Sequence, residues 1–228
     1  MIKGICTFIL LVVLLILLIF NTSVTRLGSG FLIGGGKHVI TYYDLVKESE
    51  TLKIKFPNED DIKVDVVFLD SASNLAILKL KESPKVKRDP LVINQKGLGI
   101  RSESVFTLGY PWTNTMEDQH ILIEGSANTI SKSIELNMNL EPVHSGSPLF
   151  NIRQEVIGMV LFEAHAKSIF SAHESRHFVV PALLLEKALK AAKINTITFP
   201  SEKVPGEEVS RESFIIKSKN NIVLIEAT

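Results

Sequence analysis

Short β-type segments, separated by turn residues, fill most of the chain after residue 26. Some alternate apolar and polar residues, as in LKIKF at 52–56, and others begin with several apolar residues in a row, as in LAILKL at 75–80. Clusters of Gly, Asn, Asp and Ser, such as the three glycines at 34–36, stand between them. Because such clusters mark turns and these runs mark strands, the pattern predicts an all-β sandwich or barrel. We predict one soluble helix near the C-terminal end, from Pro181 to about Lys193.

The composition is that of one folded domain with a small appendage. Hydrophobic residues make up 45% of the 228 residues, and 25 Lys and Arg balance 25 Asp and Glu. This content is too apolar for a disordered chain, and the balanced charge argues against a nucleic-acid partner. Cys6 is the one cysteine and lies in the N-terminal apolar run. The rest of the chain therefore has no thiol for a disulfide, a metal site or a nucleophile.

An apolar run occupies residues 5–20, where Thr7 is the only conventional polar side chain. As a helix rising about 1.5 Å per residue, the run and its neighbours can just cross a hydrocarbon layer of about 30 Å. We expect residues 1–25 to be a retained transmembrane anchor, with Lys3 in the cytoplasm and the globular part outside it. The alternative is a cleavable signal peptide, which would release a secreted protein.

The last part of the chain combines a polar linker with two β-rich runs. The runs flank Lys219-Asn220-Asn221, and this arrangement predicts a β-hairpin. We therefore expect a membrane anchor at 1–25, a barrel domain at 26–195, and a linker with a hairpin tail at 196–228.

Three segments of the barrel domain carry motifs of a known family. They are GSGFLIGGGKHVITYYDLV at 28–46, VVFLDSASNLAILKL at 66–80 and EPVHSGSPLFNIRQEVIGMV at 141–160. In this order, they resemble the trypsin-like serine proteases, most closely the HtrA/Deg branch. The similarity extends over about residues 28–193. It implies two packed six-stranded β-barrels with the catalytic site between them.

The resemblance assigns three catalytic positions, and two of them hold unexpected residues. The serine position holds Ser145, in Ser-Gly-Ser-Pro-Leu. The histidine position holds Asp44, and the aspartate position, immediately before Leu75, holds Asn74. Val143 stands two residues before the serine, where the family has a glycine beside the oxyanion hole.

These replacements remove the base that a serine nucleophile needs. An imidazole can take the hydroxyl proton near neutral pH, whereas the Asp44 carboxylate is too acidic and too short for this task. We expect Asp44 to form a hydrogen bond with Asn74 that preserves the geometry of an inactive site. Val143 also puts the oxyanion hole in doubt, because a glycine there turns its backbone more freely. Efficient proteolysis is therefore not expected.

No other histidine is well placed to act as the base. His144 is adjacent to Ser145, and neighbouring side chains on a loop diverge. His177 falls where the family has a small residue at the wall of the specificity pocket, so we expect it to fill part of that pocket. His38 is six residues before Asp44, at the start of its strand, so we expect it at the opposite end of that element. Surface or core positions are expected for His120, His165 and His173. Their spacing matches no metal-binding motif, so we expect neither a metal nor a cofactor.

Two functions from different classes are consistent with these residues. The first is a membrane-anchored pseudoprotease that binds a protein or an extended peptide, and in which Ser145 is kept for hydrogen bonds within its loop. A peptide could pair with the strand that follows the nucleophile, at Val160, Leu161, Phe162 and Glu163. The second is a slow or atypical serine endopeptidase that uses Ser145 with a displaced base. A covalent adduct on Ser145 separates the two hypotheses.

Overall fold

The computed structural model describes residues 25–57, 59–86, 88, 91, 93–94, 102–110, 120–130, 133–163, 176–194 and 210–228. Within these ranges, no helix is both long and apolar enough to cross a membrane. Residues 1–24 lie outside them, so the transmembrane anchor stays a prediction. His165 and His173 also lie outside the described residues.

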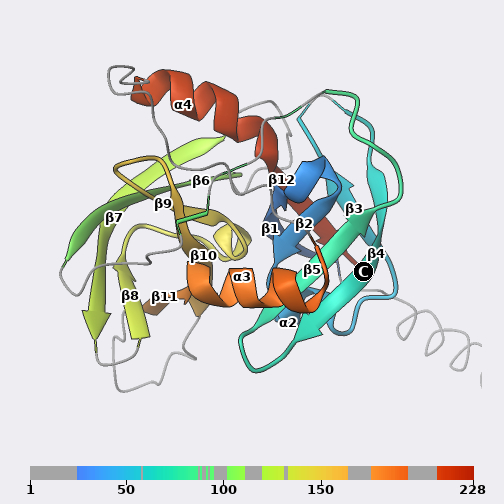
Figure 1. The fold of residues 1–228 in the computed structure, drawn as a ribbon, viewed down its shortest axis with the longest axis horizontal. Helices are drawn as coiled ribbons and strands as arrows, with labels where there is room; N and C mark the ends of the chain where they lie inside the picture. The colour runs from blue at the N-terminus through green and yellow to red at the C-terminus, as the bar shows by residue number, and fades with distance from the viewer. Residues whose placement is uncertain are drawn as a thin grey trace, which may run out of the picture.

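Twelve strands in the described residues form two closed barrels of six strands each (Figure 1). The first barrel contains β1 (Arg26–Ile33), β2 (His38–Thr41), β3 (Leu52–Lys55), β4 (Ile62–Asp70), β5 (Leu75–Leu80) and β12 (Ile222–Ala227). The second contains β6 (Glu103–Gly109), β7 (Ile121–Ile130), β8 (Ser133–Asn137), β9 (Pro148–Asn151), β10 (Val156–Glu163) and β11 (Arg176–Pro181). The predicted all-β double barrel is confirmed.

Apolar side chains pack in three clusters, one inside each barrel and one between the barrels. The first four residues of strand β5, LAIL, show why a continuous apolar run forms a strand here. Leu75 and Ile77 belong to the cluster between the barrels, whereas Ala76 and Leu78 belong to the cluster inside the first barrel. A strand that is buried on both faces needs no polar alternation.

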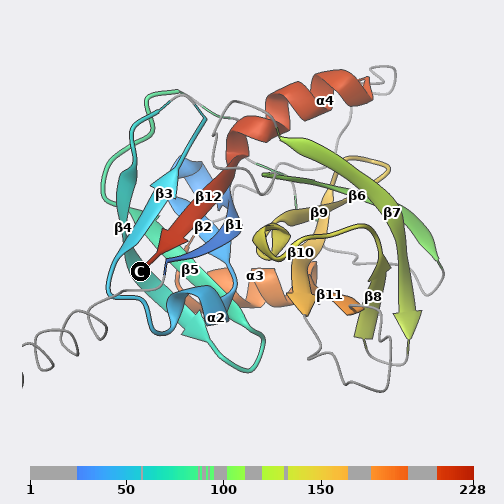
Figure 2. The ribbon, with the colours of Figure 1, turned by 180° about the vertical axis from the view of Figure 1, so that it is seen from behind.

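The helices are short and connect or cover the strands. They are η1 (Gly34–Gly36), α2 (Tyr43–Val46), η2 (Pro142–His144), α3 (Ala182–Ala191), α4 (Arg211–Ser218) and η3 (Lys219–Asn221). The helix predicted after Pro181 is confirmed as α3, which packs against β5 of the first barrel and against β10 and β11 of the second. Helix α4 lies on the opposite side of the molecule (Figures 1 and 2). There, the ring of Phe214 packs edge-on against those of Phe106 and Phe150, with centroids 6.0 and 5.2 Å away.

The hairpin predicted around Lys219-Asn220-Asn221 is wrong. The first of its two runs is helix α4, which Ser210 caps by accepting a hydrogen bond from the N–H of Ser213 at 3.2 Å. The second run is β12, which pairs antiparallel with both β1 and β3 (Figure 2). A strand with partners on both sides satisfies more of its backbone groups than a two-stranded hairpin on the surface. Residues 222–227 therefore belong to the first barrel and not to a separate tail.

The strands follow the same order around both barrels. In the second barrel this order is β6-β7-β8-β11-β10-β9, and β9 closes the ring on β6. The first barrel has the same order if β12 is counted as its first strand, which gives β12-β1-β2-β5-β4-β3. Strand β12, the last in the chain, thus takes the place in the first barrel that β6, the first strand of the second barrel, takes there.

Candidate functional site

The loop that carries Ser145 follows strands of the second barrel but is held by the first. The N–H of Ser29 in β1 donates to the carbonyl oxygen of Ser145 at 2.8 Å. The Ser29 hydroxyl donates to the carbonyl oxygen of Val143 at 2.7 Å. The Thr41 hydroxyl donates to the carbonyl oxygen of Ser29 at 2.8 Å. Ser29 and Thr41 are completely buried. The loop therefore lies where the two barrels meet, as the resemblance implies for the catalytic site.

Gly146 allows this loop to approach β1 closely. Its φ is +92°, in the region that residues with a Cβ rarely adopt. A Cβ at this position would overlap with the carbonyl oxygen of Ser29. The glycine of the Ser-Gly-Ser-Pro-Leu motif is thus required by the contact between the barrels.

The Ser145 hydroxyl is buried and accepts a hydrogen bond inside the protein. The residue is 4% exposed, and its Oγ accepts from the backbone N–H of Phe162 in β10 at 2.9 Å. Among the described residues, no carboxylate or imidazole forms a hydrogen bond with this oxygen. The hydroxyl therefore joins its loop to β10, 17 residues further along the chain.

Two backbone N–H groups of the loop, those of Ser145 and Gly146, also have partners within the fold. The first donates to the carbonyl oxygen of Pro142 at 3.1 Å and the second to that of Val160 at 2.9 Å. An oxyanion hole needs such donors aimed at the developing negative charge. Val143 is 1% exposed and packs in the cluster between the barrels. That Val143 disrupts the oxyanion hole stays a prediction.

Asp44 and Asn74 form the hydrogen-bonded pair expected from the sequence. The N–H of Asp44 donates to Asn74 Oδ1, and Asn74 Nδ2 donates to Asp44 Oδ2, both at 3.1 Å. Asp44 Oδ1 contacts Lys47 Nζ at 2.9 Å, and this hydrogen bond raises the pKa of Lys47. The side chain of Asp44 is 53% exposed. Both of its carboxylate oxygens have partners, and neither partner is Ser145.

His144 is part of a reciprocal cap at the start of η2. Its Nδ1 accepts a hydrogen bond from the N–H of Glu141 at 2.8 Å, and the Glu141 side chain accepts from the N–H of His144. The ring lies where Gly109 of β6 leaves room, since a Cβ there would overlap with it. Burial lowers the pKa of His144. The ring therefore packs toward β6, consistent with the expectation that it diverges from Ser145.

His177 lies in β11 and packs against the neighbouring strand. It is 6% exposed, and its ring stacks on that of Phe162 with centroids 5.0 Å apart. Burial lowers the pKa of His177. Phe162 is also the residue whose N–H donates to Ser145. The imidazole of His177 is therefore connected to the nucleophile loop through Phe162. That His177 narrows a specificity pocket stays a prediction.

The predicted peptide-binding edge, Val160 to Glu163, is partly engaged in the fold. Strand β10 pairs with β11 on one side. On the other side, the N–H of Val160 donates to the carbonyl oxygen of Ser147 at 2.9 Å, and its own carbonyl oxygen accepts from Gly146. The N–H of Phe162 is bonded to Ser145. A peptide strand would have to replace these bonds or bind beyond them, so this edge stays a prediction.

Two supports of the site were not foreseen from the sequence, the bonds from Ser29 and the bond from Phe162. The one signal for the first was a glycine on each side of Ser29, because glycine in a strand often marks close backbone approach. No local signal marks the second. Within the described residues, no group of three or more His, Cys, Asp and Glu side chains is arranged to hold a metal.

Comparisons with known proteins agree with this geometry. The sequence model of the family described as "Trypsin-like peptidase domain" matches residues 28–159, more than half of the chain. Similar relatives include probable periplasmic serine endoproteases, described as DegP-like, from Pseudomonas fluorescens (24% identical), Ectopseudomonas mendocina (28%) and Rickettsia prowazekii (27%). Each similarity covers 58% of this chain but only 27 or 28% of the relative.

A solved structure also shares the fold. The crystal structure of the serine endoprotease from Yersinia pestis matches with a TM-score of 0.59 and 18% sequence identity. The match covers 72% of this chain and 57% of that chain. At this level of identity, the likeness shows the fold alone.

Proposed function

Because the chain belongs to the trypsin-like peptidase family, we propose that it is a member without protease chemistry, which binds a protein or an extended peptide outside the cytoplasm. The observation that carries this proposal is the set of partners at the three catalytic positions. Asp44 is bonded to Asn74 and Lys47, and the Ser145 hydroxyl accepts from Phe162. None of these bonds takes the hydroxyl proton from Ser145, which attack on a carbonyl carbon requires.

Serine acyl transfer needs a base that takes the hydroxyl proton and donors that stabilise the oxyanion. In other serine proteases, loss of one triad residue lowers turnover by about 10⁴- to 10⁶-fold. Here two of the three triad residues differ from the family pattern, and the N–H of Ser145 donates inside the fold. Together these features favour a binding protein over a protease.

A place outside the cytoplasm is supported by the apolar run at 5–20 and by the periplasmic relatives. We propose that residues 1–25 anchor the chain in the membrane, with release by signal cleavage as the alternative. Alkaline carbonate washing of membranes tests this, because an anchored chain stays in the pellet. Intact mass then reports whether the first residues are still present. Release into the supernatant with a shortened mass would contradict the anchor.

One observation favours the second candidate, a slow serine endopeptidase. The N–H of Phe162 donates to Ser145 Oγ at 2.9 Å, and a donor at this oxygen stabilises its deprotonated form. A displaced base or a bound partner would then have to accept the proton.

Labelling with a fluorophosphonate probe tests the proposal. The full chain in neutral detergent is compared with its Ser145→Ala variant and with an active serine protease as the positive control. We expect no label on the full chain while the control protease is labelled. Labelling that Ser145→Ala abolishes would overturn the proposal and favour the endopeptidase. Circular dichroism of both chains shows whether they are folded.

A further inference from the structure

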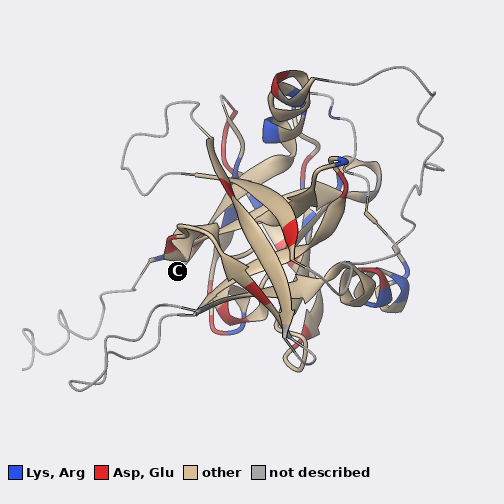
Figure 3. Ribbon diagram, turned by 90° about the vertical axis from the view of Figure 1, so that its left-hand side faces the viewer, with Lys and Arg blue, Asp and Glu red and all other residues tan. Residues whose placement is uncertain are grey.

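Three apolar side chains are exposed together on strand β4. Val66, Val67 and Leu69, called here the β4 patch, are 42%, 41% and 47% exposed. The other exposed large apolar side chains in the described part of the chain stand singly. In the second barrel, which faces the viewer in Figure 3, they are Ile121 in β7 and Ile152 in the turn after β9. Single exposed apolar side chains are ordinary on a protein surface, whereas a group of them marks a contact surface.

The β4 patch continues an apolar face of the first barrel. Val66 pairs with Leu78 of β5, and Leu69 pairs with Ala76. Residues directly opposite each other in a sheet have their side chains on the same face. Leu78 and Ala76 belong to the cluster inside the first barrel, so Val66 and Leu69 extend that inner face into solvent. Between these two pairs the register shifts, and Val67 is the extra residue of a β-bulge.

The β4 patch lies at the end of the first barrel where the chain enters it. Leu27, Glu226, Lys53 and Lys63 lie side by side in β1, β12, β3 and β4. Each of these strands is antiparallel to the next, so β4 runs from Lys63 toward the end at which β1 begins. Strands β1 and β3 each begin only one residue before this row, whereas Val66 is three residues beyond it. Strand β3 therefore ends before it can cover the β4 patch.

The chain before β1 limits how far this end of the barrel can be from a membrane. Only five residues, 21–25, separate the apolar run at 5–20 from Arg26. Fully extended, five residues span at most about 18 Å. The run itself gives a helix of about 24 Å, so neighbouring residues must take part in a crossing of about 30 Å, which shortens the spacer further. With the run as an anchor, the β4 patch therefore lies close to the headgroup layer.

A bilayer surface fits the β4 patch better than the spacer does. In the spacer, Asn-Thr-Ser-Val-Thr, only Val24 is apolar, so these residues offer little apolar cover. Interfacial proteins bury apolar side chains at the boundary between headgroups and acyl chains and keep their polar groups among the headgroups. The flanking carboxylates suit that layer. Asp65 pairs with Lys81 at 3.0 Å, and Asp70 accepts from two backbone N–H groups of the turn after β4.

We propose that the β4 patch docks on the surface of the lipid bilayer and holds the first barrel against the membrane. Val66, Val67 and Leu69 enter the boundary between headgroups and acyl chains, and Asp65 and Asp70 stay among the headgroups. The inference rests on the proposed membrane anchor but goes beyond it, because it assigns a second contact with lipid to the folded domain. The domain then has a fixed orientation on the membrane and does not swing freely on its spacer.

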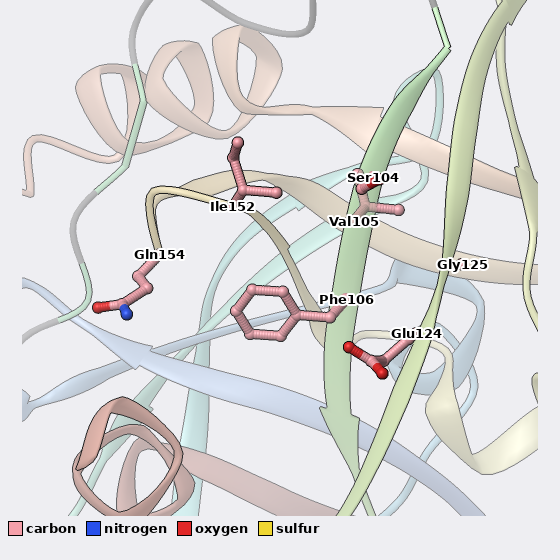
Figure 4. A pocket seen from close by; sticks show the side chains of 7 residues that line it. All are labelled: Ser104, Val105, Phe106, Glu124, Gly125, Ile152 and Gln154. Atoms are coloured by element: carbon pink, nitrogen blue, oxygen red, sulfur yellow. The ribbon is translucent and has the colours of Figure 1, made fainter. Parts of the chain in front are cut away.

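Quenching by nitroxide lipids tests this contact. In the full chain, Cys6→Ser removes the native thiol, and Val67→Cys carries the fluorophore NBD. The chain is reconstituted into phosphatidylcholine vesicles that contain a lipid with a nitroxide on its headgroup. The matched control carries NBD at Ile152→Cys, at the rim of a pocket on the second barrel (Figure 4), where the native side chain is 76% exposed. We expect strong loss of fluorescence at position 67 and no loss above background at position 152.

A variant with Val66→Asp and Leu69→Asp should abolish the quenching at position 67, because carboxylates are costly to bury among acyl chains. Thermal melts of all labelled chains show whether they are folded.

Equal quenching at positions 67 and 152, or none at position 67, would overturn the docking. A blue shift of NBD at position 67 without quenching would overturn it as well, because a second copy of this chain or a partner protein would then cover the β4 patch. Alkaline carbonate washing of the same vesicles reports on the anchor separately. A chain that stays in the pellet without quenching keeps the anchor and loses the docking, and release without quenching overturns both.

Discussion

The two barrels have one strand order but assemble it from different parts of the chain. The second barrel uses six strands that follow one another from β6 to β11. The first uses β1 to β5 together with β12, which follows all six strands of the second barrel in the sequence. Strand β12 fits because Val223 and Ile225 pack inside the first barrel, while Ile222 and Leu224 pack between the barrels. Barrel closure therefore depends on pairing and burial, and adjacency in sequence is not required.

The two halves of the site differ in a similar way. The half from the first barrel, Asp44 and Asn74, departs from the family pattern, and the Asp44 side chain is half exposed. The half from the second barrel keeps Ser145, which is buried and bonded to Phe162. The retained residue, Ser145, is thus the one whose hydroxyl connects its loop to β10.

Removal of residues 222–228 should have the largest effect, because it leaves the first barrel open between β1 and β3. Ile222, Val223 and Ile225 are completely buried, so their loss exposes both clusters to water. We expect the backbone amides of β1 to lose their protection from hydrogen exchange, because the first barrel no longer folds cooperatively. Addition of a synthetic peptide of residues 210–228 should restore protection. An unchanged exchange pattern after truncation would show that β12 is dispensable.

A matched pair of core substitutions sharpens the comparison between the barrels. Ile225 in β12 is 0% exposed and Ile157 in β10 is 1% exposed. If β12 is as integral to its barrel as β10, both Ile225→Ala and Ile157→Ala should lower the free energy of unfolding by about 2–5 kcal/mol. Urea denaturation measures both. A much smaller cost for Ile225→Ala would mark β12 as a peripheral strand.

Acid should weaken the second-barrel half of the site. His144 Nδ1 accepts from Glu141, so its ring is neutral in the fold, and burial lowers its pKa below the ordinary 6.5. The unfolded chain therefore binds more protons, and stability falls as the pH drops below about 6.5 toward the lowered pKa. The slope is at most about 1.4 kcal/mol per pH unit for each proton.

Urea denaturation between pH 5 and pH 8 measures this slope. His144→Gln should reduce this slope only in part. The rest comes from His177, because burial lowers its pKa as well and so also makes stability fall as the pH drops. The same slope in the parent chain and in a variant without both histidines would contradict the assignment.

The smallest effect is expected in the exposed half of the site. Lys47→Ala removes the ion pair with Asp44, but exposed pairs of this kind contribute little to stability. The midpoint of urea denaturation should stay within the error of the measurement. A clear loss would mean that the first-barrel half is as constrained as the second.

The strands and the replaced catalytic residues could be predicted because they depend on local spacing. Asp44 and Asn74 sit at fixed distances from motifs such as LAILKL, so their pairing follows from the register of the family fold. The bond from Phe162 to Ser145 could not be found this way. It depends on how two segments 17 residues apart approach each other in space.

The C-terminal region escaped prediction for a different reason. The run FII suggested a strand, yet the cap at Ser210 and the packing of Phe214 on Phe106 and Phe150 select helix α4. The run IVLIEA was correctly expected to be extended. Nothing within those six residues specifies that their partners are β1 and β3, because pairing over this separation is set by tertiary packing.

The late position of β12 also sets an order of events during synthesis. All strands of the second barrel have been translated once residue 181 is added, whereas the first barrel lacks a strand until residues 222–227 follow. The barrel whose residues leave the ribosome first is therefore the last that can close. Until then, β1 and β3 present open edges that can pair with other chains. The nascent protein is most in need of protection by chaperones at its N-terminal barrel.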